Sequence, residues 1–309
     1  MSNDVQKTDT AFKRVAQRAK EAEERQKEIK SHLSPKKHKQ LDFFIADMFD
    51  TVSFRDDMAS MEHPIFALKA GDKKDRYYKH GNISVEVKPT SMGIATIHDK
   101  DVWIYCISKL MQAMYEGEEI SRTIRFTAYD FLITTNRGVS GVYYQNLRDS
   151  LERLSGTRIT TSIKTNDTMT EKGFGLIDNW EIIKEDSTGK VISLEVTLPD
   201  WLYRSITSKT VLTISSDYFR LRKPLDRRIY EIARKHCGKQ SEFKITLELL
   251  YKKTGSTTPI RNFRIAIRSL SESNELPDYF IQFDGPQDMV IFKNRNAKAY
   301  IKDLFDGNC

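Results

Sequence analysis

IRFTAYDF at residues 124–131 and FKITLELL at residues 243–250 are two versions of one pattern, and this pattern decides the fold that the sequence predicts. Each stretch continues through a glycine-containing turn into an amphipathic segment, VYYQNLRDSL at 142–151 and IRNFRIAIRSL at 260–270. One offset of 119 residues aligns the two copies without a gap. A repeated unit predicts two similar surfaces along one partner, and duplex DNA, itself periodic, is the obvious candidate.

The composition is that of a chain with two modest cores. Its 309 residues are enough for about two domains, with 39% hydrophobic and 30% charged residues. The sequence contains no run of ~18 apolar residues, so it predicts no membrane span. The charged N-terminus does not resemble a secretory signal. The three cysteines, Cys106, Cys237 and Cys309, are far apart. That spacing argues against a disulfide framework or a zinc site and fits a reducing cytoplasm.

The positive charge is concentrated in two segments. The formal net charge is +7. Residues 1–40 form a basic arm, predicted to be flexible or helical only with a partner, and residues 204–239 carry ten basic but only three acidic side chains. Residues 41–203 are acidic overall. Such asymmetry favours a polyanion bound on one face, although solvated surface charge is the alternative.

The first copy predicts the element order of a winged-helix domain, in which three helices pack around a small sheet and the third faces outward. Its predicted elements are a helix over 102–115 with Asp101 as N-cap, a strand over 123–126, helices over 127–134 and 142–154, strands over 158–163 and 175–182 with a long loop over 165–173 between them, and a strand over 191–198.

The second copy predicts the same layout. Its elements are a helix begun by Pro224, a strand over 243–246, a helix over 247–253, a third helix capped by Thr258 and ending near 273, and a wing over 279–284 and 289–293. The prediction is therefore an α+β fold of two tandem winged-helix domains related by internal duplication, over residues 41–205 and 206–309, preceded by the charged arm.

The third helix of the second copy, residues 260–271, is predicted to read DNA bases. Its apolar positions are Phe263, Ala266, Ile267 and Leu270, and its opposite face carries Arg261, Arg264 and Arg268, with Asn262 beside them. These arginines recur at helical spacing, so they share one exposed face. Guanidinium groups suit guanine O6 and N7, and they suit phosphates equally well.

The same helix in the first copy is less basic. Gln145 and Arg148 are candidates for base contacts, but Asp149 and Glu152 would repel phosphates, so this copy is expected to bind DNA weakly or to serve a protein contact. Supporting helices lie near the DNA backbone in such folds, which makes the basic residues of the stretch 220–239 candidates for phosphate contacts, and basic residues of the first copy's turn and wing strand join them. These are Arg220, Arg222, Lys223, Arg227, Arg228, Arg137, Arg158 and Lys164.

Enzymatic functions find little support in the sequence. It contains no phosphate-binding loop of the G-x-x-x-x-G-K-[ST] type. No two of its six histidines form the His-x-His pair expected of a metal-dependent origin nickase. A helix-entry turn accounts for the compact polar run HDKD at residues 98–101. The sequence therefore predicts a protein without catalysis, cofactor or metal, and a transcriptional repressor with the same fold stays open as an alternative.

Three stretches together resemble bacterial plasmid replication initiators of the replication initiator protein A family. They are DDMASMEHP at 56–64, ATIHDKD at 95–101 and the block over 129–163, within a similarity that covers roughly residues 41–300. The resemblance implies two winged-helix domains that bind repeated sites in a plasmid origin and help to open an A·T-rich segment. It also implies recruitment of the host replication initiator and helicase-loading proteins, repression of the gene's own promoter, and a homodimer in some states.

Overall fold

The computed structural model describes residues 32–38, 43–46, 64–80, 83–165, 168–184, 187 and 191–295. Most of the predicted arm over 1–40 and nearly all of the motif over 56–64 lie outside these residues. Within the described ranges, no helix is both long and apolar enough to cross a bilayer.

The first unit contains the predicted helices and a three-stranded antiparallel sheet of order β4-β8-β7. Its elements are α2 (Asp101–Glu116), β4 (Thr123–Phe126), α3 (Ala128–Thr134), α4 (Gly141–Gly156), β7 (Asn179–Lys184) and β8 (Val191–Thr197). The predicted start of the first helix is wrong by one residue, because Lys100 occupies the N-cap of α2 without a side-chain cap bond. Asp101 lies inside the helix, where it pairs with arginines instead of capping.

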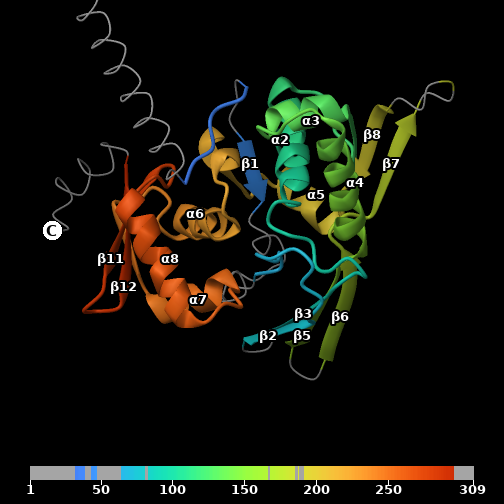
Figure 1. Cartoon of the computed structure of the whole chain (residues 1–309). Helices are drawn as coiled ribbons and strands as arrows, with labels where there is room; N and C mark the ends of the chain where they lie inside the picture. The colour runs from blue at the N-terminus through green and yellow to red at the C-terminus, as the bar shows by residue number, and fades with distance from the viewer. Residues whose placement is uncertain are drawn as a thin grey trace, which may run out of the picture.

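The second unit repeats this order on the other side of the molecule (Figure 1). Its elements are α6 (Pro224–His236), β10 (Glu242–Thr246), α7 (Leu247–Thr254), α8 (Ile260–Ser273), β11 (Tyr279–Asp284) and β12 (Met289–Asn294). The sheet order, β10-β12-β11, is equivalent to β4-β8-β7. In both units the strand that precedes the helix pair binds the last strand of the wing, so both are winged-helix-like.

Local chemistry also agrees between the two units at the same offset. Thr127 caps α3 by accepting a hydrogen bond from the backbone N–H of Asp130, and Thr246 caps α7 in the same way from Leu249. After these helices, Asn136 and Gly255 both have left-handed backbone angles, with φ of 57° and 65°. These matches place the same turn chemistry between the second and third helices of each unit.

The third helices do not match in the face that they bury. In α8 the inward side chains are Phe263, Ile267 and Leu270, whereas α4 buries Leu147, Ser150, Leu151 and Leu154. Arg148 is exposed, although the offset aligns it with the fully buried Ile267. The sequence repeat therefore predicts the helix itself correctly but not the direction in which its side chains point.

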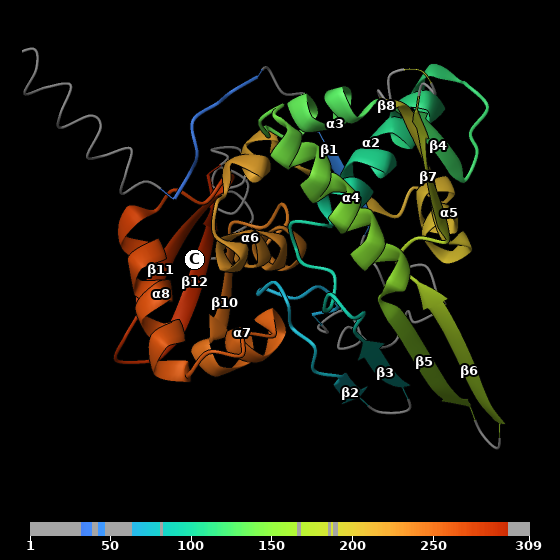
Figure 2. The same cartoon turned by 45° about the vertical axis from the view of Figure 1, so that its right-hand side comes forward.

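The predicted wing of the first unit is wrong. Apart from Arg158 and Gly175, residues 158–163 do not pair with 175–182; β5 (Arg158–Thr165) pairs instead with β6 (Thr168–Gly175) along its whole length. With β2 (Arg76–His80) and β3 (Ile83–Lys88) they form a separate sheet of order β2-β3-β5-β6. The predicted polar loop is part of a strand because its threonines favour extended backbone. This β5–β6 hairpin projects away from the helices (Figure 2).

Two hydrophobic cores divide the described residues. Most buried side chains up to Ile206 on α5 (Asp200–Thr207) belong to the first core, and those from Ile214 on β9 (Val211–Ile214) onward belong to the second, which also includes Ile104 of α2. The cores do not follow the chain strictly, because β1 (Phe43–Ala46) pairs with β9 and places Phe43 in the second core. The second core therefore includes residues from within the predicted 41–205 domain.

Candidate nucleic-acid interface

One side of α8 anchors the helix in the second core. Phe263, Ile267 and Leu270 are 1% exposed or less. The ring of Phe263 meets that of Tyr251 edge-on, with centroids 5.1 Å apart, and the Tyr251 hydroxyl donates to the carbonyl of Thr258 at 2.7 Å. This bond fixes the turn before the helix. Pro259, not the predicted Thr258, occupies the N-cap.

The opposite side of α8 faces solvent, as its amphipathic pattern predicts. Arg261, Asn262 and Arg268 are exposed. Within the described ranges, neither Arg261 nor Arg268 is within ion-pair distance of a carboxylate. In Figure 2, α8 lies toward the viewer at the outer edge of the second unit. This side of α8 (Arg261, Asn262, Ile265 and Arg268), which we call the α8 face, can therefore meet a large ligand without rearranging the fold.

The third predicted arginine of this helix differs from the other two. Arg264 donates from Nη2 to both carboxylate oxygens of Asp288, at 2.9 and 2.8 Å. Asp288 lies between β11 and β12, far from the helix in sequence, and has a φ of 53°. Arg264 is therefore neutralised by a carboxylate of the wing, unlike Arg261 and Arg268. Both partners are about two-fifths exposed, so a stronger anion can compete for the guanidinium.

The corresponding helix of the first unit has fewer groups available for a ligand. Arg148 is exposed, but the side-chain amide of Gln145 donates to Asp149 at 2.8 Å. Arg153 turns inward and binds the buried Asp99 through Nε and Nη2, both at 2.8 Å. Glu152 remains exposed on the same helix. The acidic character of α4 that the sequence indicates is thus present on its surface.

Four of the eight predicted phosphate contacts have guanidinium groups that already bind carboxylates or carbonyls of the protein itself. Arg227 is 4% exposed and binds Asp101 at 2.6 Å as well as two backbone carbonyls. Arg137 binds the same carboxylate at 2.7 Å. Arg228 binds Glu231 and the carbonyl of Lys253, and Arg220 binds Asp217 and the carbonyl of Ser34. Moving these guanidiniums outward would leave buried carboxylates and carbonyls without donors.

The other predicted phosphate contacts lie on the surface where they are described. Arg158 on β5, Arg222 and Lys223 are exposed. Lys223 also approaches the ring of His32, with its Nζ 3.4 Å from both ring nitrogens. Lys164 belongs to β5, but its side chain lies outside the described residues.

The run His98–Asp101 is the centre of an ion-pair network between the two units, a role that the sequence prediction missed. Asp101, with 0% exposure, binds Arg137 of the first unit and Arg227 of the second. Lys100 reaches α6 and pairs with the buried Glu231 at 2.9 Å. We call this group, with Asp99 and Arg153, the interunit network. It connects the start of α2 to both units through charge-assisted bonds, which are stronger than neutral ones.

Burial and the neighbouring cations change the pKa values in this network. Burial lowers the pKa of His98 to about 4, and the Arg227 guanidinium acts in the same direction. Burial alone would raise the pKa of Asp99, but hydrogen bonding to Arg153 holds it below its ordinary value. The pKa of Glu231 is likewise lowered against the effect of burial, by Lys100 and Arg228. Asp99 and Glu231 are therefore ionised and His98 is neutral near pH 7.

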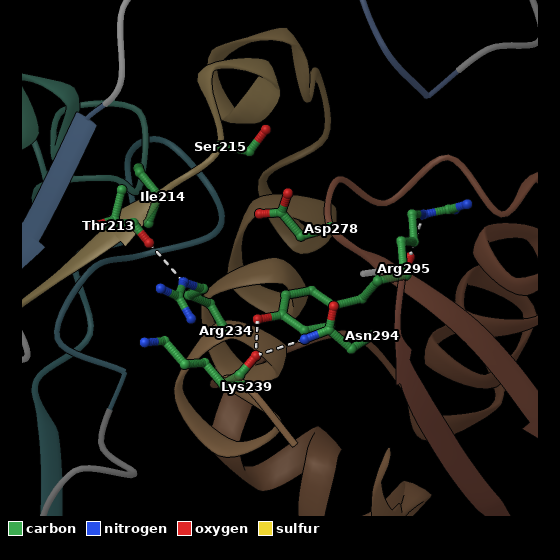
Figure 3. A pocket seen from close by; sticks show the side chains of 10 residues that line it. Thr213, Ile214, Ser215, Arg234, Lys239, Asp278, Asn294 and Arg295 are labelled. Carbon is green, nitrogen blue, oxygen red and sulfur yellow. Dashed lines mark hydrogen bonds between the residues drawn. The ribbon is translucent and has the colours of Figure 1, made fainter. Parts of the chain in front are cut away.

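A polar hollow of about 520 Å³ lies between β9, the end of α6 and the wing of the second unit (Figure 3). Arg234, Lys239 and Arg295 contribute positive charge to its lining, and Asp278 contributes one negative charge. The two arginines are held by backbone carbonyls: Arg234 donates from Nε to Thr213 at 2.6 Å, and Arg295 donates to Leu276 and Tyr279. This hollow is not on the α8 face, and no pattern in the sequence indicated it.

Comparisons with known proteins agree with the resemblance that the sequence motifs indicate. The sequence pattern of the family described as RPA, replication initiator protein A, matches residues 55–281. A "Putative replication protein" of Wigglesworthia glossinidia brevipalpis is 48% identical over 265 residues, which is 84% of this chain and 96% of the relative.

Solved structures with a similar fold belong to RctB. A crystal structure of RctB domains 2 and 3 has a TM-score of 0.54 at 12% identity, and covers 75% of this chain and 95% of that one. A selenomethionine derivative of the same two domains has a TM-score of 0.56 at 13% identity, with the same coverage. At such low identity these neighbours support the two-unit architecture of mixed helices and strands.

Proposed function

The chain belongs to the replication initiator protein A family, and we propose from this membership that it starts plasmid replication by binding specific sequences of double-stranded DNA at an origin. The observation that carries the proposal is the α8 face. An outward helix on a winged-helix-like unit presents two arginines without carboxylate partners among the described residues. That arrangement suits the major groove, where arginine makes bidentate contacts with guanine.

In this proposal Arg261, Arg268 and Asn262 contact bases, and Arg264 joins them when a DNA acceptor displaces Asp288. Residues seven apart on a helix are about 10 Å apart along its axis. Arg261 and Arg268 therefore span about three base-pair steps of ~3.4 Å each. The two guanidiniums would contact positions near the two ends of one short recognition element.

The first unit contributes a weaker contact through Arg148 and Gln145 of α4. In Figure 2, α4 and α8 both lie on the side that faces the viewer, which supports the approach of one duplex to both units. The acidic groups on α4 limit the affinity of this contact. We further propose that the units arose by duplication, since their sheet order and helix caps agree, and that together they bind repeated sites.

Phosphate contacts are proposed for Arg158, Arg222 and Lys223. Each neutralised phosphate adds about −0.9 to the slope of log K against log salt concentration. Three contacts predict a slope of roughly −3 from these residues. The four arginines that bind inside the protein contribute nothing to this slope.

Binding at repeated sites gives these contacts a role in initiation. DNA that follows two connected units is deformed, and the cost depends on how flexible its sequence is. We propose that this deformation favours opening of an adjacent A·T-rich segment. Recruitment of host replication initiator and helicase-loading proteins, a homodimeric state and repression of its own promoter belong to the same proposal, on the strength of family membership.

The direct test starts with duplexes selected by the full-length protein from a random-sequence pool. We expect a defined consensus and a salt slope of −3 or steeper for the selected duplex. Arg261→Ala should weaken binding to that duplex about 10- to 100-fold, corresponding to ~1–3 kcal/mol. The matched control is Arg204→Ala, which removes an exposed arginine that pairs with Asp200 on α5 and should leave binding unchanged.

A consensus that never emerges from the selection would reject sequence-specific binding. Replication itself is tested with a plasmid that carries only this gene and its flanking DNA. Autonomous replication that fails with Arg261→Ala supports an initiator. Binding without replication would identify a repressor, and covalent protein–DNA adducts on relaxed circles would identify a nickase.

A further inference from the structure

Ile265 lies at the middle of the α8 face and does not belong to the second hydrophobic core. Its side chain is 56% exposed, while Phe263 and Ile267 on either side in the sequence are buried. It lies four residues after Arg261 and three before Arg268, so all three side chains share one stripe of the helix. The apolar side chain is thus flanked by the two guanidiniums that have no carboxylate partner in the described part of the chain.

Neither helix formation nor packing explains isoleucine at this place. The core contacts of α8 are complete without it, and β-branched residues form helices slightly less readily than arginine, lysine or glutamate. Single exposed apolar residues are ordinary on protein surfaces. What distinguishes Ile265 is its position in the centre of a cationic stripe.

The flanking charges decide which kind of partner fits. An apolar protein surface over Ile265 would also cover Arg261 and Arg268, and burying cations without partners is costly. The major groove satisfies all three groups, because guanine presents acceptors to arginine and thymine presents its C5-methyl group to apolar side chains. One surface of DNA therefore matches the alternation of cation, aliphatic group and cation along the helix.

We propose that Ile265 determines specificity by packing against the C5-methyl group of a thymine located between the base pairs contacted by Arg261 and Arg268. The inference rests on the proposed DNA-binding function and extends it to one base. The spacing along α8 places this thymine one or two base-pair steps from each arginine contact, since four helical residues rise about 6 Å.

The experiment uses full-length protein and the duplex obtained by selection from the random pool. Each thymine of the recognition element is replaced in turn by deoxyuridine, which removes only the C5-methyl group and keeps base pairing and the O4 acceptor. We expect one central position at which deoxyuridine weakens binding about fourfold, equivalent to ~0.8 kcal/mol for one buried methyl group.

Variants assign that effect to Ile265. Ile265→Ala should bind the thymine and deoxyuridine duplexes equally, while Ile265→Val, which keeps a branched apolar side chain, should retain most of the discrimination. Arg268→Ala serves as the matched control on the same helix. It should weaken binding to both duplexes and leave their ratio near four.

Three outcomes would overturn the inference. Deoxyuridine could have no effect at any thymine, or its effect could persist in Ile265→Ala, which would assign the methyl contact to another residue. Alternatively, Ile265→Ala could change the oligomeric state measured by sedimentation while the thymine–deoxyuridine ratio stays the same, which would show that a second copy of the chain covers the α8 face. Failure of the selection itself would instead reject the proposed function, so the two failures are distinguishable.

Discussion

Arginines serve opposite purposes in the interunit network and on the α8 face. Arg137 and Arg227 converge on one fully buried carboxylate, Asp101. Arg261 and Arg268 are exposed, with no carboxylate partner in the part of the chain that the structure describes. The difference teaches that a basic sequence is not by itself a binding surface. An arginine is most available to DNA where the fold leaves its guanidinium outside, and Arg261 and Arg268 on the α8 face meet that condition.

The largest expected effect comes from breaking the interunit network. Asp101→Asn leaves two inward arginines without their anion, and removing one partner of a buried ion pair costs about 3–5 kcal/mol. Unfolding in urea should show that loss. The control is Asp178→Asn, which removes an exposed partner of Arg122 and should change the free energy of unfolding by no more than ~0.5 kcal/mol. Similar stability of the two variants would contradict a structural role for the network.

The second-largest expected effect is a loss of stability in acid, caused by His98 in the interunit network. The pKa of His98 falls from 6.5 to about 4 in the folded protein. Between these two pH values, His98 is therefore protonated in the unfolded chain but neutral in the folded one. The contribution of neutral His98 to the free energy of unfolding is therefore complete above pH 6.5 and is lost as the pH falls toward 4. We expect a loss of up to about 2–3 kcal/mol between pH 7 and pH 4.5. His98→Gln should reduce this loss when the free energy of unfolding is measured in urea at several pH values. The same pH dependence in the variant as in the wild type would contradict the role of His98.

The burial of His236 in the second unit provides a comparison for that experiment. Burial lowers the pKa of His236 to about 4 as well, helped by Lys253. His236→Gln should therefore also reduce the acid sensitivity. The two contributions should add in the double variant, because these residues make no contact with each other that would couple them.

An intermediate effect should separate stability from binding. Arg268→Ala should lower affinity for the selected duplex by about 1–3 kcal/mol and leave the urea midpoint unchanged, because the side chain is exposed. Arg227→Met should do the reverse, with a lower midpoint and an unchanged salt slope. If Arg227→Met made the salt slope shallower by about 0.9, Arg227 would be a phosphate contact after all.

The smallest expected effect concerns Asp288, whose carboxylate forms an ion pair with Arg264. Asp288→Asn removes the competing charge and frees the guanidinium for DNA. Exposed ion pairs are worth ~0.2–1 kcal/mol, so affinity should rise by about two- to fivefold with little change in stability. Affinity measured at several salt concentrations checks this expectation, and a decrease in affinity would show that Asp288 orients Arg264 for binding.

Local patterns in the sequence were sufficient to predict much of the fold. The repeated segments correctly predict both helix pairs, because the apolar stripe of a helix is a short-range signal. The one threonine cap that the sequence predicted, Thr258, is wrong by one residue. The exposure of Arg261 and Arg268 follows in the same way from helical periodicity. The family resemblance is likewise confirmed by the family pattern and by the 48% identical relative.

Contacts between distant parts of the chain could not be predicted in this way. Arg227 and Asp101 are 126 residues apart, and nothing near Arg227 in the sequence indicates a buried anion. Nothing near Asp288 in the sequence indicates its partner either, because Asp288 contacts Arg264 of α8 only through the folding of the wing against the helix. The bounds of the β5–β6 hairpin were predicted wrongly because the polar side chains of residues 165–173 are typical of a loop, and the pairing of β5 with β6 that makes most of them a strand is not visible in the sequence. Ile265 does not belong to the predicted apolar stripe, and no role was assigned to it from the sequence because a single exposed isoleucine carries no local signal.

The most direct test of the α8 face replaces single guanines of the selected duplex with 7-deazaguanine, which lacks the N7 acceptor. We predict that wild-type protein loses affinity at two guanines about three base pairs apart. Arg261→Ala should lose its sensitivity at one of them and Arg268→Ala at the other. Wild-type sensitivity at both guanines in both variants would contradict the assignment of α8 as the helix that reads DNA.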